Sequence, residues 1–491
     1  MLVRIRLATL LMISMSLPMA IGRVDAANSD AAKGRPNVLL LMSDDLTATA
    51  LSCYGNPVCK TPNIDRLAAR GMRFTRAYCQ ATFCGPSRAS MLSGYYPHAT
   101  NVFGYVSGRE AIGDRATWPQ HFKDNGYRTS RVSKIFHMGV PGGIEEGSDG
   151  TDDAVSWTER FNSRGPEWKA PGVGETLEGN PDGSRPVVGG NTFVVVAADG
   201  DDSVHSDGKT AGKAVELIQQ YKGNDQPFFL AVGFVRPHVP FVAPKAYFDR
   251  YPHEQIELPP KIAGDQDDIP RAGINYKTSA NMKMDVTRQK KAVAGYYASV
   301  SFMDAQVGKV LDALDTAGLA DSTIVIFTSD HGYHLGEHDF WAKVSLHEES
   351  AAVPLIIRVP GKKPGVSRSF VELIDLYPTI SRLCNLSVPE RLQGLDIGPV
   401  LDDPTKQVRD AAFSINGPKS GDGMLLRDDR WAFIQYKEDA SRGVELYDMD
   451  ADPKQIRNLA ADSANRELVE AFKVRVAEKL RKIRTNDLKP R

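Results

Sequence analysis

Short runs of apolar residues recur between residues 37 and 359, and turn-forming residues bound each run. Runs of this length, rich in Val, Ile, Leu and Phe, predict buried β-strands. The predicted strands cover residues 37–42, 127–132, 227–235, 323–328 and 355–359. Because these runs are apolar on both faces, they favour a sheet that is covered on both sides.

Helical patterns lie between the predicted strands. Residues 62–69 follow Thr61, which can cap a helix N-terminus, and precede Gly71, which suits a helix end. A longer helical pattern runs from about residue 289 to residue 317. Alternating strands and helices predict an α/β fold, a large and mostly parallel sheet sandwiched by helices, in a main domain over residues 34–408.

The pattern changes after about residue 408. Residues 424–427, 431–436 and 444–447 predict three strands of an antiparallel meander, and an amphipathic helix is predicted from about residue 466 to residue 483. We therefore expect a smaller C-terminal α+β subdomain over residues 409–491.

The N-terminus has the pattern of an export signal. Arg4 and Arg6 precede a mostly apolar stretch over residues 7–21, and Ala26 supplies a small residue for cleavage. A membrane anchor is the alternative, but the stretch is shorter than the ~20 residues that span a bilayer and Pro18 interrupts it. We predict a signal peptide over residues 1–26, an exported protein (periplasmic or secreted), and no stable membrane insertion.

Charge and cysteine content narrow the function further. The formal net charge of −1 gives no polyanion-binding field over the whole surface, so no nucleic-acid partner is expected. Cysteines of exported proteins usually pair, and five is an odd number, which leaves at least one for another purpose. Cys53 with Cys59, and Cys79 with Cys384, are candidate pairs.

Charged and polar residues follow four of the predicted strands. In open α/β sheets, ligands bind outside the carboxyl ends of the strands. The segments at those ends are Ser43-Asp44-Asp45, Ser133-Lys134-Ile135-Phe136-His137, Arg236-Pro237-His238 and Ser329-Asp330-His331. One such segment is usually a solvated turn, but four predict a shared site.

The chemistry of these residues is of two kinds. The carboxylates of Asp44, Asp45 and Asp330 suit Ca²⁺ or Mg²⁺. Because neighbouring side chains on a strand point to opposite faces, Asp44 and Asp45 converge only if the strand has already ended. The second kind is cationic or protic: Lys134, His137, His238 and Lys343. A metal ion beside several cations suits an oxyanion ester as substrate.

The segment from Cys84 to Gly94 predicts a turn that leads into a helix, with Arg88 placed to hold an anion. Its Cys84-Gly85-Pro86-Ser87-Arg88 sequence resembles the hallmark of the formylglycine-dependent sulfatases of the alkaline phosphatase superfamily. Residues 126–129 with Lys134 and His137 resemble a second signature of that family, with Ser133 where Gly is usual. The closing segment, residues 445–459, matches as well, so the resemblance covers nearly the whole chain after the signal.

Within that family, residues 227–241, 329–338 and 341–343 most resemble the branch that removes the 2-O-sulfate of a uronic acid. The resemblance implies an alkaline phosphatase-like fold and an exported sulfatase that acts on a sulfated saccharide. A sulfatase for another glycan, such as an algal polysaccharide, is the close alternative. A phosphatase or phosphonate hydrolase, or a non-catalytic glycan-binding relative, fits less well.

The resemblance also implies roles for the site residues. A formylglycine-generating or other sulfatase-maturing enzyme would oxidise Cys84 to formylglycine (3-oxoalanine), whose hydrate attacks sulfur. Arg88 and Lys134 would hold the charge of the diol and sulfate, and His137 would assist proton transfer. The leaving oxygen would be protonated by His238 or Lys343. The ligands of Ca²⁺ would be Asp44, Asp45, Asp330, His331 and the modified Cys84; many relatives carry Asn where His331 stands.

Two less regular segments are expected near the pocket. Residues 95–108 and the stretch from residue 139 to residue 208, rich in Gly, Asp and Ser, are predicted to line it. The acids of the second stretch, Asp149, Asp152 and Asp153, are expected in a solvated loop rather than at a cation.

Overall fold

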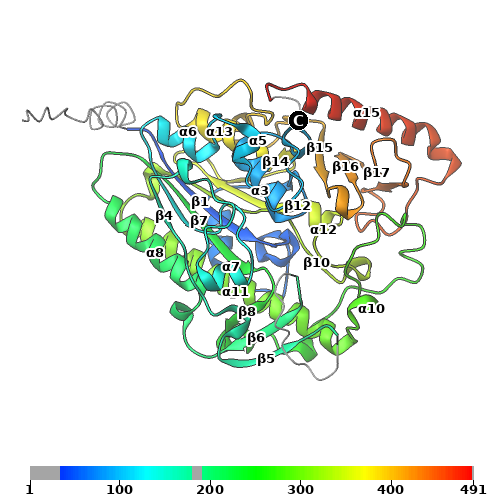
Figure 1. Cartoon of the computed structure of the whole chain (residues 1–491), viewed down its shortest axis with the longest axis horizontal. Coiled ribbons are helices and arrows are strands. Elements are labelled where there is room, and N and C mark those ends of the chain that lie inside the picture. Colours follow the sequence, from blue (N-terminus) through cyan, green and yellow to red (C-terminus); the bar gives the residue numbers. More distant parts are fainter. Residues whose placement is uncertain (1–33, 180–190, 489–491) are drawn as a thin grey trace, which may run out of the picture.

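The structure of the chain is a computed structural model that describes residues 34–179 and 191–488 (Figure 1). The predicted signal peptide, residues 1–26, lies outside the described residues. Among the helices within the described ranges, none has the length and apolar character needed to cross a membrane.

In the described ranges, a nine-stranded mixed sheet forms the centre of the molecule. Five neighbouring strands are parallel, in the order β9, β1, β7, β3, β4, so their carboxyl ends lie at one edge. Their bounds are β9 Thr323–Ser329, β1 Asn37–Asp44, β7 Phe228–Pro237, β3 Arg128–Ser133 and β4 Glu159–Phe161. The remaining strands are β12 (Ala352–Arg358), β2 (Met72–Tyr78), β13 (Gly365–Ser367) and β14 (Val371–Glu372).

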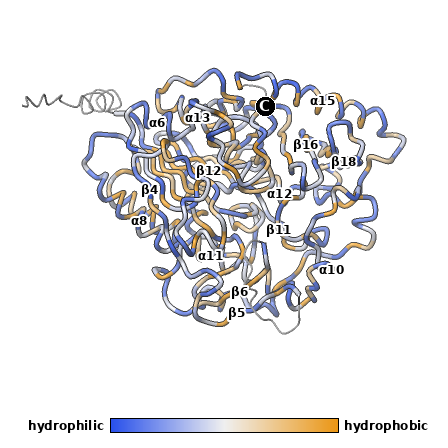
Figure 2. Tube along the Cα trace, viewed as in Figure 1, coloured by the Kyte–Doolittle hydropathy of each residue, from blue (hydrophilic) through white to orange (hydrophobic). Residues whose placement is uncertain are grey.

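Helices cover both faces of this sheet, as predicted. β1 is buried on both sides: Leu39 and Leu41 pack with one layer of helices, and Val38 and Leu40 pack with the other. The first layer contains α2 (Pro62–Ala68), α8 (Ser206–Tyr221) and α11 (Val286–Thr316); the second contains α3 (Cys84–Ser93), α6 (Trp118–Asp124) and α13 (Leu376–Leu383). Hydrophobic residues accordingly concentrate in the central strands (Figure 2). The expected alkaline phosphatase-like α/β fold is confirmed.

The C-terminal part is a second, smaller unit beside the large sheet (Figure 1). Four antiparallel strands, β15 (Ala411–Ile415), β16 (Gly423–Asp428), β17 (Trp431–Tyr436) and β18 (Val444–Asp448), form a sheet. α15 (Arg466–Arg484) packs on one face of it through Phe472 and Val476. β15, which the sequence analysis missed, bonds to the chain just before Cys84, because Thr82 N donates to Ile415 O at 3.0 Å.

Some local features differ from the sequence analysis or go beyond it. β12 is antiparallel to both of its neighbours, a direction that the prediction of a mostly parallel sheet did not specify for this run. The stretch predicted as a loop insertion contains β4, β5 (Gly172–Thr176) and β6 (Val194–Ala198); the last two form a small sheet with β8 (Phe241–Pro244).

All three acids of that stretch form ion pairs, and two of them, Asp152 and Asp153, are buried, whereas Asp149 is half exposed. Arg131, a fully buried side chain, lies 2.9 Å from Asp149 and 3.0 Å from Asp152, and Asp153 pairs with Arg109. A buried guanidinium needs such partners, which explains why the acids cluster here.

The five cysteines are all free, so neither candidate disulfide is present. Three of the four thiols outside the site contact a backbone carbonyl instead: Cys59 Sγ lies 3.8 Å from Tyr297 O, Cys79 Sγ 3.4 Å from Ala351 O, and Cys384 Sγ 3.8 Å from Pro36 O. The two disulfides proposed from proximity in the sequence and from an oxidising compartment are therefore wrong. With all five cysteines free, their odd number does not single out Cys84.

Candidate active site

The carboxyl ends of four parallel strands converge around Cys84. Asp44 is the last residue of β1, and Asp45 adopts the left-handed region with φ of 62°. The strand therefore breaks between these two residues, as their convergence requires. Ser133, at the end of β3, also has a positive φ of 59°, which explains why glycine suits this position in the family signature.

Cys84 is the first residue of α3 and is 1% exposed. Its Sγ lies 3.3 Å from Nε2 of His331, 3.4 Å from Nζ of Lys343 and 3.8 Å from a carboxylate oxygen of Asp45. The turn packs so closely that a Cβ on Gly85 would lie 2.5 Å from Gly104 O. The thiol therefore has a fixed position among carboxylate, imidazole and ammonium groups.

Arg88 joins three of the strand ends. Its Nε lies 2.8 Å from Asp330 Oδ2 and its Nη2 lies 3.1 Å from Asp44 Oδ1. Its Nη1 donates to the carbonyl oxygens of Lys134 and Ile135 at 2.7 Å and 2.9 Å. Burial alone lowers the pKa of Arg88, but Asp330 and Asp44 outweigh it and raise the pKa above its ordinary value. The guanidinium of Arg88 is therefore charged, and its hydrogen bonds hold it in a fixed orientation.

Two lysines occupy the same site. Lys134 donates a short hydrogen bond to Asp44, and Lys343 Nζ lies 2.7 Å and 3.0 Å from the two oxygens of Asp45. Burial raises the pKa of Asp44, but Lys134 and Arg88 outweigh burial and hold that pKa well below its ordinary value. For Asp45, burial outweighs Lys343 and raises the pKa.

The carboxylates fit a hard divalent cation. One ligand atom from each of Asp44, Cys84, Asp330 and His331 lies within 4.8 Å of the others, and Asp45 forms a similar group with Cys84 and His238. Carboxylate oxygens are the ligands that Ca²⁺ prefers, whereas the imidazole of His331 contributes nitrogen. Three carboxylates face three cations here, so a divalent ion would leave the site positive and suited to a sulfate ester.

Two histidines complete the predicted set. The ring of His137 stacks on Tyr105 with centroids 4.1 Å apart, and burial together with Lys134 lowers the pKa of His137 to about 2. His238 Nε2 lies 3.0 Å from Lys343 Nζ. Burial and Lys343 hold the pKa of His238 well below its ordinary value, whereas Asp45 outweighs burial and raises the pKa of Lys343. Both imidazoles are therefore neutral beside a charged lysine.

The structure brings all the sequence-derived site residues into this one region. It also shows contacts that the sequence analysis missed: Tyr105 covers His137, and Ser87 Oγ donates to Asp330 O at 2.5 Å. No sequence pattern marked Tyr105, whereas Ser87 lies inside the family hallmark. Of the segments expected to line the pocket, residues 103–105 and, in the described part of the second stretch, Asn191 do so.

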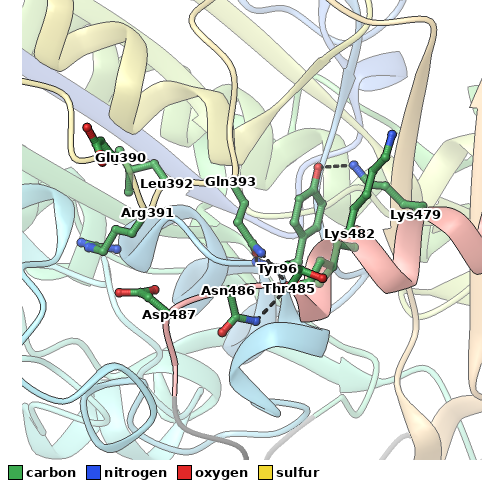
Figure 3. A pocket seen from close by; sticks show the side chains of 11 residues that line it. Tyr96, Glu390, Arg391, Leu392, Gln393, Lys479, Lys482, Thr485, Asn486 and Asp487 are labelled. Carbon is green, nitrogen blue, oxygen red and sulfur yellow. Dashed lines mark hydrogen bonds between the residues drawn. The ribbon is translucent and has the colours of Figure 1, made fainter.

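A cavity of about 650 Å³ lies elsewhere, between Tyr96 and the end of α15 (Figure 3). Lys479 donates to the hydroxyl of Tyr96 there at 2.7 Å. This cavity contains none of the strand-end residues, so we assign the active site to the region around Cys84.

Comparisons with known proteins agree with this geometry. The sulfatase family profile matches residues 36–386, and the profile of the N-sulphoglucosamine sulphohydrolase C-terminal region matches residues 336–483. Human iduronate 2-sulfatase is 36% identical over 419 residues, which cover 77% of this chain and 73% of the human protein.

Solved structures share the fold at lower identity. A protein in complex with its substrate D-glucosamine-2-N,6-O-disulfate has a TM-score of 0.71 and 21% identity, over 92% of this chain and 99% of that chain. The phosphonate monoester hydrolase of Silicibacter pomeroyi has a TM-score of 0.74 and 21% identity, over 91% and 96%. The family profile and the human relative go beyond fold: the chain belongs to the sulfatase family and is a sulfuric ester hydrolase.

Proposed function

We propose that this sulfatase is exported and removes the 2-O-sulfate of a uronic acid in a sulfated glycan, with formylglycine at position 84 and a bound Ca²⁺. The name of the human relative supports a 2-sulfate on a uronic acid as the substrate. The observation that carries the mechanism is the position of Cys84, a buried residue enclosed by Asp45, His331 and Lys343.

The unmodified thiol is poorly suited to catalysis. Burial, with a further contribution from Asp44, raises the pKa of Cys84 well above its ordinary value, so the thiol stays protonated. Only the thiolate is a good nucleophile. An aldehyde formed from this side chain by a sulfatase-maturing enzyme would supply, as its hydrate, an oxygen nucleophile for attack on sulfur.

The surrounding residues bind charge and move protons. Arg88 and Lys134 are fully buried and paired with Asp44; in our proposal their positive charges stabilise the diol and the sulfate. Burial and Lys134 keep the imidazole of His137 neutral and weakly basic, so we assign it the role of a hydrogen-bond partner that assists the proton transfer of the diol. Asp44, Asp45 and Asp330 would hold Ca²⁺, with His331 beside them; the ion supplies positive charge where negative charge develops.

Geometry favours Lys343 over His238 as the group that protonates the leaving oxygen. Lys343 Nζ lies 3.4 Å from Cys84 Sγ, whereas no hydrogen bond joins His238 to Cys84 among the described residues, and His238 Nε2 contacts the Lys343 ammonium at 3.0 Å. We therefore assign proton donation to Lys343 and its positioning to His238.

The assignment predicts a dependence on the leaving group. In Lys343→Ala, hydrolysis of a sugar sulfate should fall about 100-fold or more, because an alkoxide leaves poorly without a proton donor. Hydrolysis of 4-nitrophenyl sulfate should fall much less, since nitrophenolate leaves without one. The measurement is kcat for both substrates. Equal losses for both would remove the donor role from Lys343, and a larger selective loss in His238→Gln would give that role to His238.

Product analysis tests the proposed function. The holoenzyme should release sulfate from a 2-O-sulfated uronate disaccharide faster than from a sulfated algal oligosaccharide, and faster than it releases phosphate or phosphonate from matched esters. Faster desulfation of the algal substrate would overturn the proposed specificity. Sequencing the N-terminus of the protein from its native host tests export, which requires cleavage after Ala26.

A further inference from the structure

A cavity of about 740 Å³ opens beside Cys84. Lys343 and Tyr105 form its inner wall, and both also contact the residues of the active site. Its outer wall comes from two loops, residues 271–276 of the main domain and residues 416–421 of the C-terminal subdomain. The volume suits a saccharide unit in addition to the one that carries the reacting sulfate.

Close backbone contacts hold these loops in place. A Cβ on Gly421, which has φ of +104°, would lie 2.5 Å from Ala272 O, so the two outer loops touch. A Cβ on Gly417 would lie 3.3 Å from the ring of Phe83, the residue before Cys84. The loop of the C-terminal subdomain therefore packs against both the other outer loop and the residue that precedes Cys84.

The charged side chains that line this cavity are all cationic. Its lining contains the cations Arg271, Lys343, Lys419 and Arg442, and it contains no carboxylate among the described residues. Arg271, Lys419 and Arg442 are exposed and form no ion pair with any residue of the described ranges; Arg442 donates only to Gly421 O, at 3.3 Å. In a chain with a net charge of −1, such a local excess of cations favours an anionic ligand.

Two aromatic rings complete the lining. Tyr105 is 51% exposed and Tyr276 is 43% exposed, and both rings line the cavity. Each offers apolar ring surface beside a polar hydroxyl, a combination that is common in binding sites. Cationic groups beside exposed tyrosines suit a charged saccharide better than a neutral or apolar ligand.

We propose that this cavity binds the saccharide next to the one being desulfated, and that Lys419, Arg442 and Arg271 recognise a sulfate group on that neighbour. This inference rests on the proposed function, because it names a second charged group on the same substrate. The C-terminal subdomain would then set specificity through two cations that lie far from Cys84 in the sequence.

The test uses two disaccharides that both carry a 2-O-sulfated uronate and differ in whether the neighbouring hexosamine is sulfated. Binding is measured by calorimetry on the full chain with Cys84→Ala, so that turnover does not interfere. We expect about tenfold tighter binding of the disaccharide with the sulfated hexosamine. Adding Lys419→Gln and Arg442→Gln should reduce this preference to about twofold or less, because each exposed charge pair contributes up to about fivefold. Lys222→Gln, an exposed lysine outside the cavity at the end of α8, is the matched control.

The outcomes separate the two proposals. An unchanged preference in the double variant, or no preference in the chain with Cys84→Ala alone, would overturn the cavity assignment, and so would an equal loss in Lys222→Gln. The active enzyme is tested separately for sulfate release from the same disaccharides. Absence of release while the preference persists would contradict the proposed function and leave the cavity assignment standing.

Discussion

Replacing Cys84 with alanine should abolish sulfate release, by about four orders of magnitude or more, while the protein stays folded. Alanine has no atom that oxidation converts into an aldehyde, so the proposed nucleophile is lost. The folded state should survive, because the change removes one sulfur atom from a buried turn that backbone contacts define. The measurements are sulfate release by ion chromatography and the urea unfolding midpoint.

Cys79→Ala is the matched control, because Cys79 is also buried and free but contacts backbone carbonyls outside the site. This variant should retain activity. The mass of the peptide that contains residue 84, taken from protein of the native host, gives independent evidence: the aldehyde makes the peptide lighter and reactive to carbonyl reagents. Turnover in Cys84→Ala, or an intact thiol in the active native protein, would contradict the mechanism.

Replacing Asp330 with asparagine should lower both calcium affinity and the rate, the rate by about 100-fold or more. Asparagine keeps the shape of the side chain and can still accept the backbone hydrogen bonds that Asp45 N and His331 N donate at 3.2 Å and 3.0 Å. It removes the charge that faces Arg88 and, in our proposal, Ca²⁺. The measurements are calcium content after dialysis, calcium binding by calorimetry and kcat.

Asp312→Asn controls for the loss of a carboxylate in general, because Asp312 is 61% exposed and pairs with Arg66 on the surface. It should change neither calcium binding nor rate. Unchanged calcium affinity in Asp330→Asn would place the metal elsewhere. A lower rate with unchanged calcium affinity would leave Asp330 only the role of holding Arg88.

Many residues of the candidate site could be predicted from local sequence. Apolar runs marked the five strands, and the residues after four of them, Asp44, Lys134, His238 and Asp330, are the ones that meet around Cys84. This worked because parallel strands bring their carboxyl ends to one edge, so position along each strand also gives position in space. The hallmark at residues 84–88 identified the family independently of the sheet.

Other features depended on pairing between distant segments. β2 alternates Arg and Thr with apolar residues and has no continuous apolar run, and β12 reads like a parallel strand although it runs antiparallel between β9 and β2. Strand direction depends on the connections that precede a run rather than on its composition. The free cysteines show the same limit, since disulfide geometry is a property of the folded chain.

The sequence alone determined the fold class, the family and the candidate site residues, because each of these is encoded in a short pattern. Tertiary packing decided the contacts between those residues, such as those of Lys343 with both Asp45 and His238. It also decided the composition of the neighbouring cavity, whose cations Arg271, Lys419 and Arg442 come from separate loops. Loops far apart in sequence carry no shared periodicity, so only the fold brings their side chains to one ligand.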